Sequence, residues 1–188
     1  MAVNDKADII VVGMHGRKGP KADPTVLGSA VQYMSLNYIC PILIVKDRTL
    51  RADKKSGYRW AFCTDGSDKS FKCLEEIAKI IDHEKDTVIA ITVKCVNMHI
   101  DKIKERAEES FKKLNVKGEF VELPHGDTVP PETIVSYLMQ CATPETYIDF
   151  VAVGNQGADY TSHHDKKYLG SVASGVIRKS KLNVLFIA

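Results

Sequence analysis

The chain has 188 residues, of which 44% are hydrophobic and 27% are charged. These proportions are typical of a globular protein with one domain, or with one domain and part of another, and they exclude a disordered chain. A formal net charge of +2 gives no general attraction to nucleic acid or to an anionic membrane surface, and no apolar run approaches the ~20 residues that a membrane helix needs.

Cysteine usage and the first residues predict a cytoplasmic protein. The five cysteines are widely spaced and form no Cys-x-x-Cys pair, which argues against a disulfide framework or a zinc knuckle. Residues 1–6 contain no basic segment that leads into an apolar stretch, so no signal peptide is expected. Cys40, Cys63 and Cys95 lie in or beside apolar runs and are expected to be small buried side chains rather than reactive thiols.

The first elements of the chain repeat the last ones. Corresponding positions occur in the same order: 7–13 and 148–154, 16 and 157, 28–29 and 170–171, 41–45 and 183–187. A long segment that begins near Tyr58 precedes the second copy only. We therefore expect the closing part of one domain at 1–46, a basic linker at 47–57 and a complete domain at 58–188. A solvated linker is favoured over a nucleic-acid patch for the basic segment.

Within the second unit, apolar periodicity predicts strands and helices in alternation. Strands are predicted at 60–63, 87–93, 119–123, 150–153 and 184–187. Helices are predicted from Ser67 or Asp68 through Ile81, over 100–114, from Pro130 with a core face of Ile134, Val135, Leu138 and Met139, and over 171–179. This alternation predicts an α/β fold, a five-stranded parallel doubly wound sheet with helices on both faces, plus an extra β-α-β unit at the N-terminus.

Two groups of residues at strand ends are candidates for a binding site. Such sheets bind ligands beyond the carboxyl ends of their strands, where Asp65 and Gly154 are expected. Asp65 either accepts hydrogen bonds from a ribose or forms an Asx turn over the next two residues. The glycines at 154 and 157, with Gly170 and Ser171, either cradle phosphates or form a strand exit and a helix cap. Their spacing fits neither a P-loop nor a dinucleotide-binding fingerprint.

The combination of these motifs resembles the universal stress protein family. The residues that carry the likeness are Thr64–Ser70 after the first strand, Phe150–Gly154, Gly170–Ala173 and Asn183–Ile187. The likeness covers 58–188 as a whole domain and 7–46 as the last third of another. It implies an adenine nucleotide alpha hydrolase-like sheet of strand order 3-2-1-4-5, and a homodimer or pseudo-dimer formed through the last strand.

The ATP-binding branch of that family carries the motif G-2x-G-9x-G-[ST]. The resemblance implies that the nucleotide-binding residues here are Asp65 at the adenosine, Val93 at the adenine pocket, and Gly154, Gly157, Gly170 and Ser171 at the phosphates. The ligand would be ATP, AMP or ADP, with or without Mg²⁺. The spacer before the third glycine departs from the motif, with 12 residues here and 11 in the first copy. For His163 and His164 within that spacer, a solvated loop is favoured over a metal site.

The leading functional hypothesis is an ATP-binding sensor or regulatory protein of the stress response. The sequence shows no activated nucleophile or base–nucleophile pair, so at most weak ATP hydrolysis is expected. The alternatives are a nucleotide-free dimerisation or interaction module, and a slow ATP hydrolase at the same site. No nucleic acid or membrane partner is expected.

The first copy has no equivalent of the first strand and no equivalent of Asp65, so it cannot build a full nucleotide site alone. A lone strand–helix–strand unit also exposes apolar surface and should not be stable by itself. We therefore predict that the strand at 42–45 packs near the strand at 184–187, in the manner of the family dimer, or that a second chain covers it. The remaining alternative is that the sequence is a fragment of a longer tandem protein.

Overall fold

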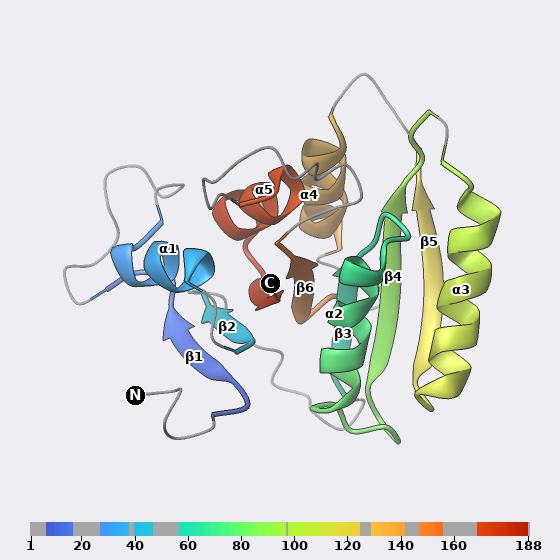
Figure 1. Cartoon of the computed structure of the whole chain (residues 1–188), viewed down its shortest axis with the longest axis horizontal. Helices are drawn as coiled ribbons and strands as arrows, with labels where there is room; N and C mark the ends of the chain where they lie inside the picture. The colour runs from blue at the N-terminus through green and yellow to red at the C-terminus, as the bar shows by residue number, and fades with distance from the viewer. Residues whose placement is uncertain are drawn as a thin grey trace.

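The computed structural model describes residues 7–16, 27–37, 40–46, 57–96, 98–124, 129–141, 147–155 and 169–187. The strands of these segments form one seven-stranded sheet in the order β1-β2-β7-β6-β3-β4-β5. Figure 1 shows the N-terminal unit, in blue, at one edge of this sheet and β5, in yellow, at the other.

The N-terminal unit consists of β1 (Ile10–Gly13), α1 (Ser29–Leu36) and β2 (Ile42–Val45). The second unit consists of β3 (Arg59–Cys63), α2 (Asp68–Ala78), β4 (Thr87–Val93), α3 (Ile100–Lys113), β5 (Lys117–Leu123), α4 (Pro130–Gln140), β6 (Phe150–Gly154), α5 (Ser171–Lys179) and β7 (Asn183–Ile187). Its strands lie in the order β5-β4-β3-β6-β7, and every neighbouring pair among them is parallel. The 3-2-1-4-5 order and the extra β-α-β unit are therefore confirmed.

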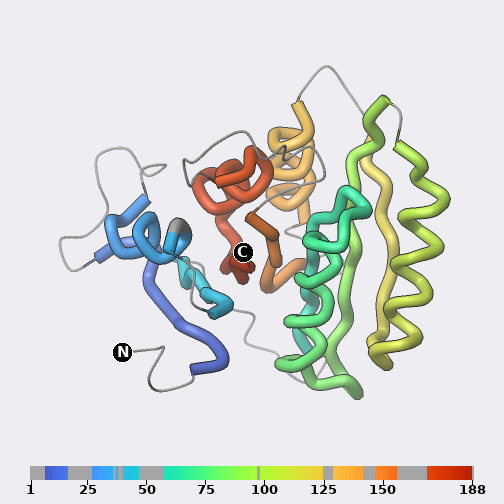
Figure 2. The backbone as a smooth tube through the Cα atoms, in the orientation of Figure 1, coloured from blue at the N-terminus to red at the C-terminus, as the bar shows by residue number. Residues whose placement is uncertain are grey.

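The two units join through their last strands. β2 runs antiparallel to β7, with Leu43 opposite Leu185 and Ile44 opposite Val184. This confirms the prediction that the strand at 42–45 packs near the one at 184–187. Because β6 occupies the other side of β7, both edges of β7 are paired within the chain. Figure 2 shows the C-terminus in the middle of the molecule for this reason, next to the N-terminal unit.

A lysine side chain reinforces this junction. The Lys46 Nζ donates to the carbonyl oxygens of Ile177 at 2.6 Å, Ser180 at 2.6 Å and Val176 at 3.3 Å, all at the C-terminal end of α5. Its backbone N–H donates to the Asn183 Oδ1 at 2.9 Å. The last carbonyls of a helix have no partner within the helix, and the Lys46 Nζ supplies them with hydrogen-bond donors.

The sheet has a separate apolar core on each face. On one face α1, α4 and α5 contribute Val31, Leu138 and Ile177 to a cluster that also contains Ile44 of β2. On the other face α2 and α3 cover a second cluster. The longest periodic helix, α3, presents Ile103, Ala107 and Phe111 to the sheet, as its 4-residue spacing dictates.

Three details of the predicted elements are wrong. α2 ends at Ala78, and Ile81, although buried, lies beyond a tight final turn in which the Ile80 and Ile81 amides both donate to the Ile77 carbonyl. β5 begins at Lys117 rather than at 119, since the β4 edge extends the pairing. Met139 is 38% exposed, because it lies about 100° around α4 from Leu138, which points into the core.

Candidate functional site

Three of the predicted site residues lie at one edge of the sheet. Val93 ends β4, Gly154 ends β6, and Asp65 follows β3 by two residues. β3 is paired with both β4 and β6, and all three strands are parallel. Their carboxyl ends therefore meet, which is where α/β sheets of this type hold ligands.

Asp65 forms the Asx turn that was one of its two predicted roles. Its Oδ1 accepts from the Ser67 backbone N–H at 3.0 Å and from the Ser67 hydroxyl at 2.6 Å. The Ser67 Oγ in turn accepts from the Ser70 amide at 3.2 Å and caps α2. The half-buried carboxylate is thus held in a fixed orientation at the N-terminus of α2, where a negative charge is favourable.

The turn after β3 is also fixed from the side of α3. Gly66 has a φ of +85°, and a Cβ there would lie 2.8 Å from the Ile103 Cγ1. Arg106 donates to the Gly66 carbonyl at 2.8 Å and to the Asp68 carboxylate at 2.6 Å. The guanidinium also lies 4.2 Å from the centre of the Phe71 ring. These contacts make the Asp65 turn a rigid part of the scaffold.

Val93 is a buried strand residue and not an exposed wall of a cavity. It is 6% exposed and belongs to the core cluster on the α4 and α5 face. It pairs with Leu123 at the end of β5. Its backbone lies at the predicted edge, whereas its side chain is largely covered.

The exit from β6 leads to the start of α5. The Asn155 amide donates to the Ile187 carbonyl at 2.8 Å, and the Asn155 carbonyl accepts from the Gly170 amide at 2.9 Å. Gly170 occupies the N-cap position of α5, and Ser171 is its exposed first residue. The structure therefore brings Gly154, Gly170 and Ser171 together. The other predicted residue, Gly157, and the His163–His164 pair lie outside the described residues.

Asn155 is a polar residue at this edge for which the sequence predicts no role. Its side-chain Oδ1 is buried, and it has no hydrogen-bond partner within the part of the chain that the structure describes. An unsatisfied buried acceptor is unfavourable unless a donor reaches it. Asn155 lies inside the glycine motif of the sequence, but only the structure shows that its Oδ1 is buried.

Two buried thiols lie behind the site. Burial raises the pKa of Cys63 to about 12, and it raises the pKa of Cys73 further, with the neighbouring Cys63 as a second cause. Both therefore remain protonated and act as small apolar groups, which is the role predicted for Cys63. Among the described residues, no group of three or more His, Cys, Asp or Glu side chains could hold a metal ion.

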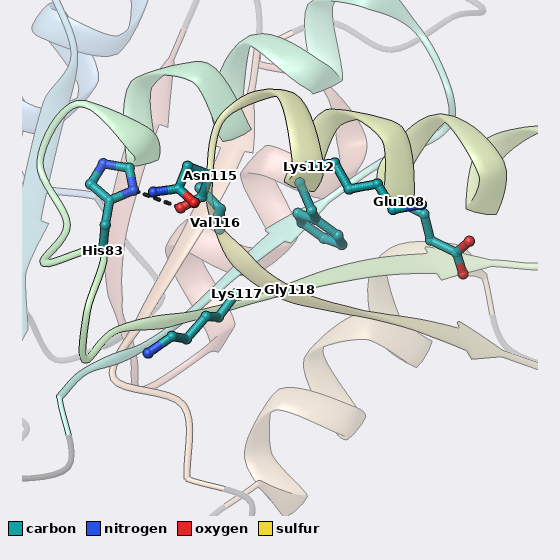
Figure 3. Close-up of a pocket in the computed structure, with 8 residues that line it drawn as sticks. His83, Glu108, Lys112, Asn115, Val116, Lys117 and Gly118 are labelled. Atoms are coloured by element: carbon teal, nitrogen blue, oxygen red, sulfur yellow. Dashed lines mark hydrogen bonds between the residues drawn. The ribbon is translucent and has the colours of Figure 1, made fainter.

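A surface depression of about 350 Å³ lies elsewhere (Figure 3). It is open, and its lining comes from the C-terminal part of α3, the start of β5 at Lys117 and the loop residue His83. His83 contacts the Asn115 carbonyl at 3.0 Å at its rim. Because strands start there rather than end, the depression is at the opposite end of the sheet from Asp65 and Gly154.

The comparisons with known proteins identify the fold. No protein-family model matches the chain, and a search of curated proteins gave no match. A solved universal stress protein in complex with cAMP is 26% identical, with a TM-score of 0.52, over 71% of this chain and 98% of that one. A universal stress protein from Archaeoglobus fulgidus DSM 4304 is 18% identical, with a TM-score of 0.66, over 98% of this chain and 62% of that one.

A functionally unknown protein from Pseudomonas aeruginosa PAO1 is also similar, with 13% identity and a TM-score of 0.60 over 99% of this chain and 64% of that one. This chain therefore spans less than two thirds of the length of the two structures that match it almost completely. It has the α/β fold of universal stress proteins, with a mostly parallel sheet extended to seven strands. None of the described helices has the length and hydrophobicity of a transmembrane segment.

Proposed function

We propose that this chain is a cytoplasmic universal stress protein that binds an adenine nucleotide at the carboxyl ends of β3, β4 and β6. The observation that carries the proposal is the meeting of the fixed Asp65 turn with the Gly154 exit and the Gly170–Ser171 helix start at one edge. The cAMP complex supports it, since that protein is 26% identical to this chain over 71% of its length. A binding and sensing role fits better than fast catalysis, because no base–nucleophile pair faces this edge among the described residues.

Each residue of the site has a proposed role that follows from its chemistry. The free backbone amides at the start of α5 and the Ser171 hydroxyl would hold phosphate oxygens, since a helix N-terminus attracts anions. Gly154, Gly157 and Gly170 would let the phosphates approach the backbone closely. Asp65 would accept a hydrogen bond from the nucleoside, because each of the two oxygens of a carboxylate can accept more than one. The Val93 backbone would border the base. ATP, ADP or AMP is the proposed ligand, with or without Mg²⁺, and the cAMP complex adds a cyclic nucleotide to the set.

A nucleotide-free interaction module is the second candidate, and the β2–β7 pairing favours it. The chain already builds, between its own two units, a junction of the kind that a dimer through the last strand would use. For either candidate function we propose the same division of the chain: 58–188 is the complete domain, 47–57 is the linker, and 1–46 is the closing part of a second domain.

Calorimetric titration of the whole chain with ATP, AMP and cAMP, with and without Mg²⁺, tests nucleotide binding. The informative variant is Asp65→Asn, which keeps an oxygen acceptor for Ser67 and removes the charge. We expect the wild type to bind and Asp65→Asn to bind at least about tenfold more weakly, a change of about 1.4 kcal/mol.

The matched control is Asp82→Asn. Asp82 forms a similar turn by accepting from the Glu84 amide at 3.0 Å, but it lies before β4, at the other end of the sheet. The Asp82→Asn variant should bind the nucleotide with the same affinity as the wild type. Wild-type protein that binds none of the nucleotides would contradict the proposal and favour the interaction module.

A further inference from the structure

One face of the N-terminal unit carries exposed apolar side chains. Val11 is 59% exposed and Val45 is 41% exposed, while Leu43 is partly buried. Val11 is opposite Leu43, and Gly13 is opposite Val45, in the parallel β1–β2 pair. Because side chains alternate along a strand, these residues share the face of the sheet that α1 does not cover. We call Val11, Leu43 and Val45 the open face.

The internal repeat shows how the same face is covered in the second unit. The residues at the positions of Val11, Leu43 and Val45 are Ala152, Leu185 and Ile187, whose exposures are 0%, 0% and 3%. There α2 packs against β6 and β3. No described helix packs on β1 in this way. The open face is therefore the place where an α2-like helix would lie.

Gly13 preserves the close approach that such a helix requires. At the equivalent Gly154, a Cβ would lie 3.5 Å from the Lys69 carbonyl oxygen and 3.8 Å from the Cys73 Sγ, so α2 crosses directly over the strand. At Gly13, the only described atom within 4 Å of a Cβ is the oxygen of the nearby His15. The first copy thus has the small residue at the crossing point, and no helix of the described residues crosses there.

The backbone at the same edge is also unpaired among the described strands. β6 lies between β7 and β3, whereas β1 has β2 as its only described neighbour. The Ile10 and Met14 amides donate to the Pro41 and Val45 carbonyls. Alternation then directs the Val11 amide to the outer side, where it can pair with a further strand.

We infer that this edge and the open face form a docking site for a partner polypeptide that supplies a β-strand followed by an amphipathic helix. The strand would pair in parallel with β1, as β3 pairs with β6, and the helix would cross Gly13 and bury Val11, Leu43 and Val45. A second copy of this chain that joined edge to edge through β1 would extend the sheet but leave the open face in water. The surface therefore fits a strand–helix partner rather than a symmetric dimer.

The other side of the sheet limits what this partner can be. Tyr33 on α1 is 67% exposed, and its counterpart on α5 is Gly175. A Cβ on Gly175 would lie 3.1 Å from the Pro131 Cβ, so α4 packs there with no room for a side chain. A tyrosine at that position excludes a helix packed as α4 is. The partner therefore matches the β3–α2 part of the second unit and not its α4.

A peptide with the sequence of residues 57–81, which spans β3 and α2, is the direct probe. We expect the whole chain, under reducing conditions, to bind the labelled peptide saturably with one site per chain in fluorescence anisotropy. Val11→Asp should weaken binding at least tenfold, because it puts a charge at the centre of the contact. Hydrogen exchange should show new protection of the Val11 and Gly13 amides in the complex.

Two controls make the result specific. Val129→Asp changes an equally exposed valine, 58% exposed, at the start of α4 and away from the open face, so it should leave binding unchanged. A probe in which Phe71, Leu74 and Ile77 are serine should not bind. Absence of binding, or equal binding by Val11→Asp, would overturn the inference. Self-association of the unliganded chain that Val11→Asp abolishes would also overturn it, because the occupant would then be a second copy.

Discussion

At the scale of single residues, Gly66 decides the geometry of the turn that carries Asp65. Its φ of +85° is in the left-handed region, and its α carbon faces the Ile103 side chain of α3. A side chain at this position would therefore be strained by the backbone and obstructed by a neighbour. The turn can orient Asp65 because glycine allows both the positive φ at position 66 and the close contact with Ile103.

Gly66→Ala should lower the free energy of unfolding by about 1–3 kcal/mol. The added Cβ would meet the Ile103 Cγ1 at 2.8 Å. Urea denaturation would measure the change. Gly16→Ala is the control, since a Cβ on Gly16 meets nothing described within 4 Å, and it should change stability by less than about 0.5 kcal/mol. Equal effects of the two substitutions would contradict the proposed strain.

At the scale of elements, Lys46 links the end of β2 to the end of α5. Its ammonium group donates to two carbonyls of α5 and to that of the C-cap residue Ser180, and desolvation lowers the pKa of Lys46 to about 8 from an ordinary value of 10.5. Between these values the unfolded chain binds more protons than the folded one. The contribution of Lys46 to the free energy of unfolding must therefore increase as the pH rises from 8 to 10.5.

Comparison of the wild type with Lys46→Met isolates this effect, because the titrations of cysteine and tyrosine are common to both proteins. The stability of the wild type relative to the variant should rise with pH in that window by up to about 3 kcal/mol, at ~1.4 kcal/mol per pKa unit. Urea denaturation at a series of pH values measures it. Lys94→Met removes an exposed lysine as a control. A difference that is constant with pH would refute the buried-ammonium argument.

At the scale of the whole molecule, the antiparallel β2–β7 contact makes one sheet out of two units. Ile44 of β2 is fully buried in the same core cluster as Val184 of β7. The N-terminal unit therefore protects a strand edge that would otherwise be open, and exposed edges pair readily with other chains.

Deletion of residues 1–56 should free the outer edge of β7 and produce a dimer of the remaining chain. The full chain should not associate through β7, because β2 occupies that edge. Light scattering coupled to size-exclusion chromatography would give both masses. A truncated chain that stays folded and monomeric would show that the β7 edge does not attract a second copy.

Local signals in the sequence predicted the type of each element and the order of the elements along the chain. The β-branched run at 87–93 and the stripe from Ile100 to Leu114 each predicted the correct type of element nearly to the residue. The repeat predicted the extra β-α-β unit. Because that unit alone would expose apolar surface, it also predicted that 42–45 packs near 184–187, as the structure shows. Element ends were less accurate, as at Ile81 and Met139, because tertiary contacts rather than periodicity decide which side chain of the last turn is covered.

The α/β fold class, the repeat and the candidate site residues were thus predictable from patterns of neighbours along the chain, and the strand order from the family resemblance. Only the three-dimensional structure showed that Val93 is buried and that, among the described residues, the Asn155 Oδ1 has no hydrogen-bond partner. It alone showed that the counterparts of Ala152 and Ile187 lie open in the first copy. These properties depend on which distant element covers a given atom, and such contacts leave no regular signal in the sequence.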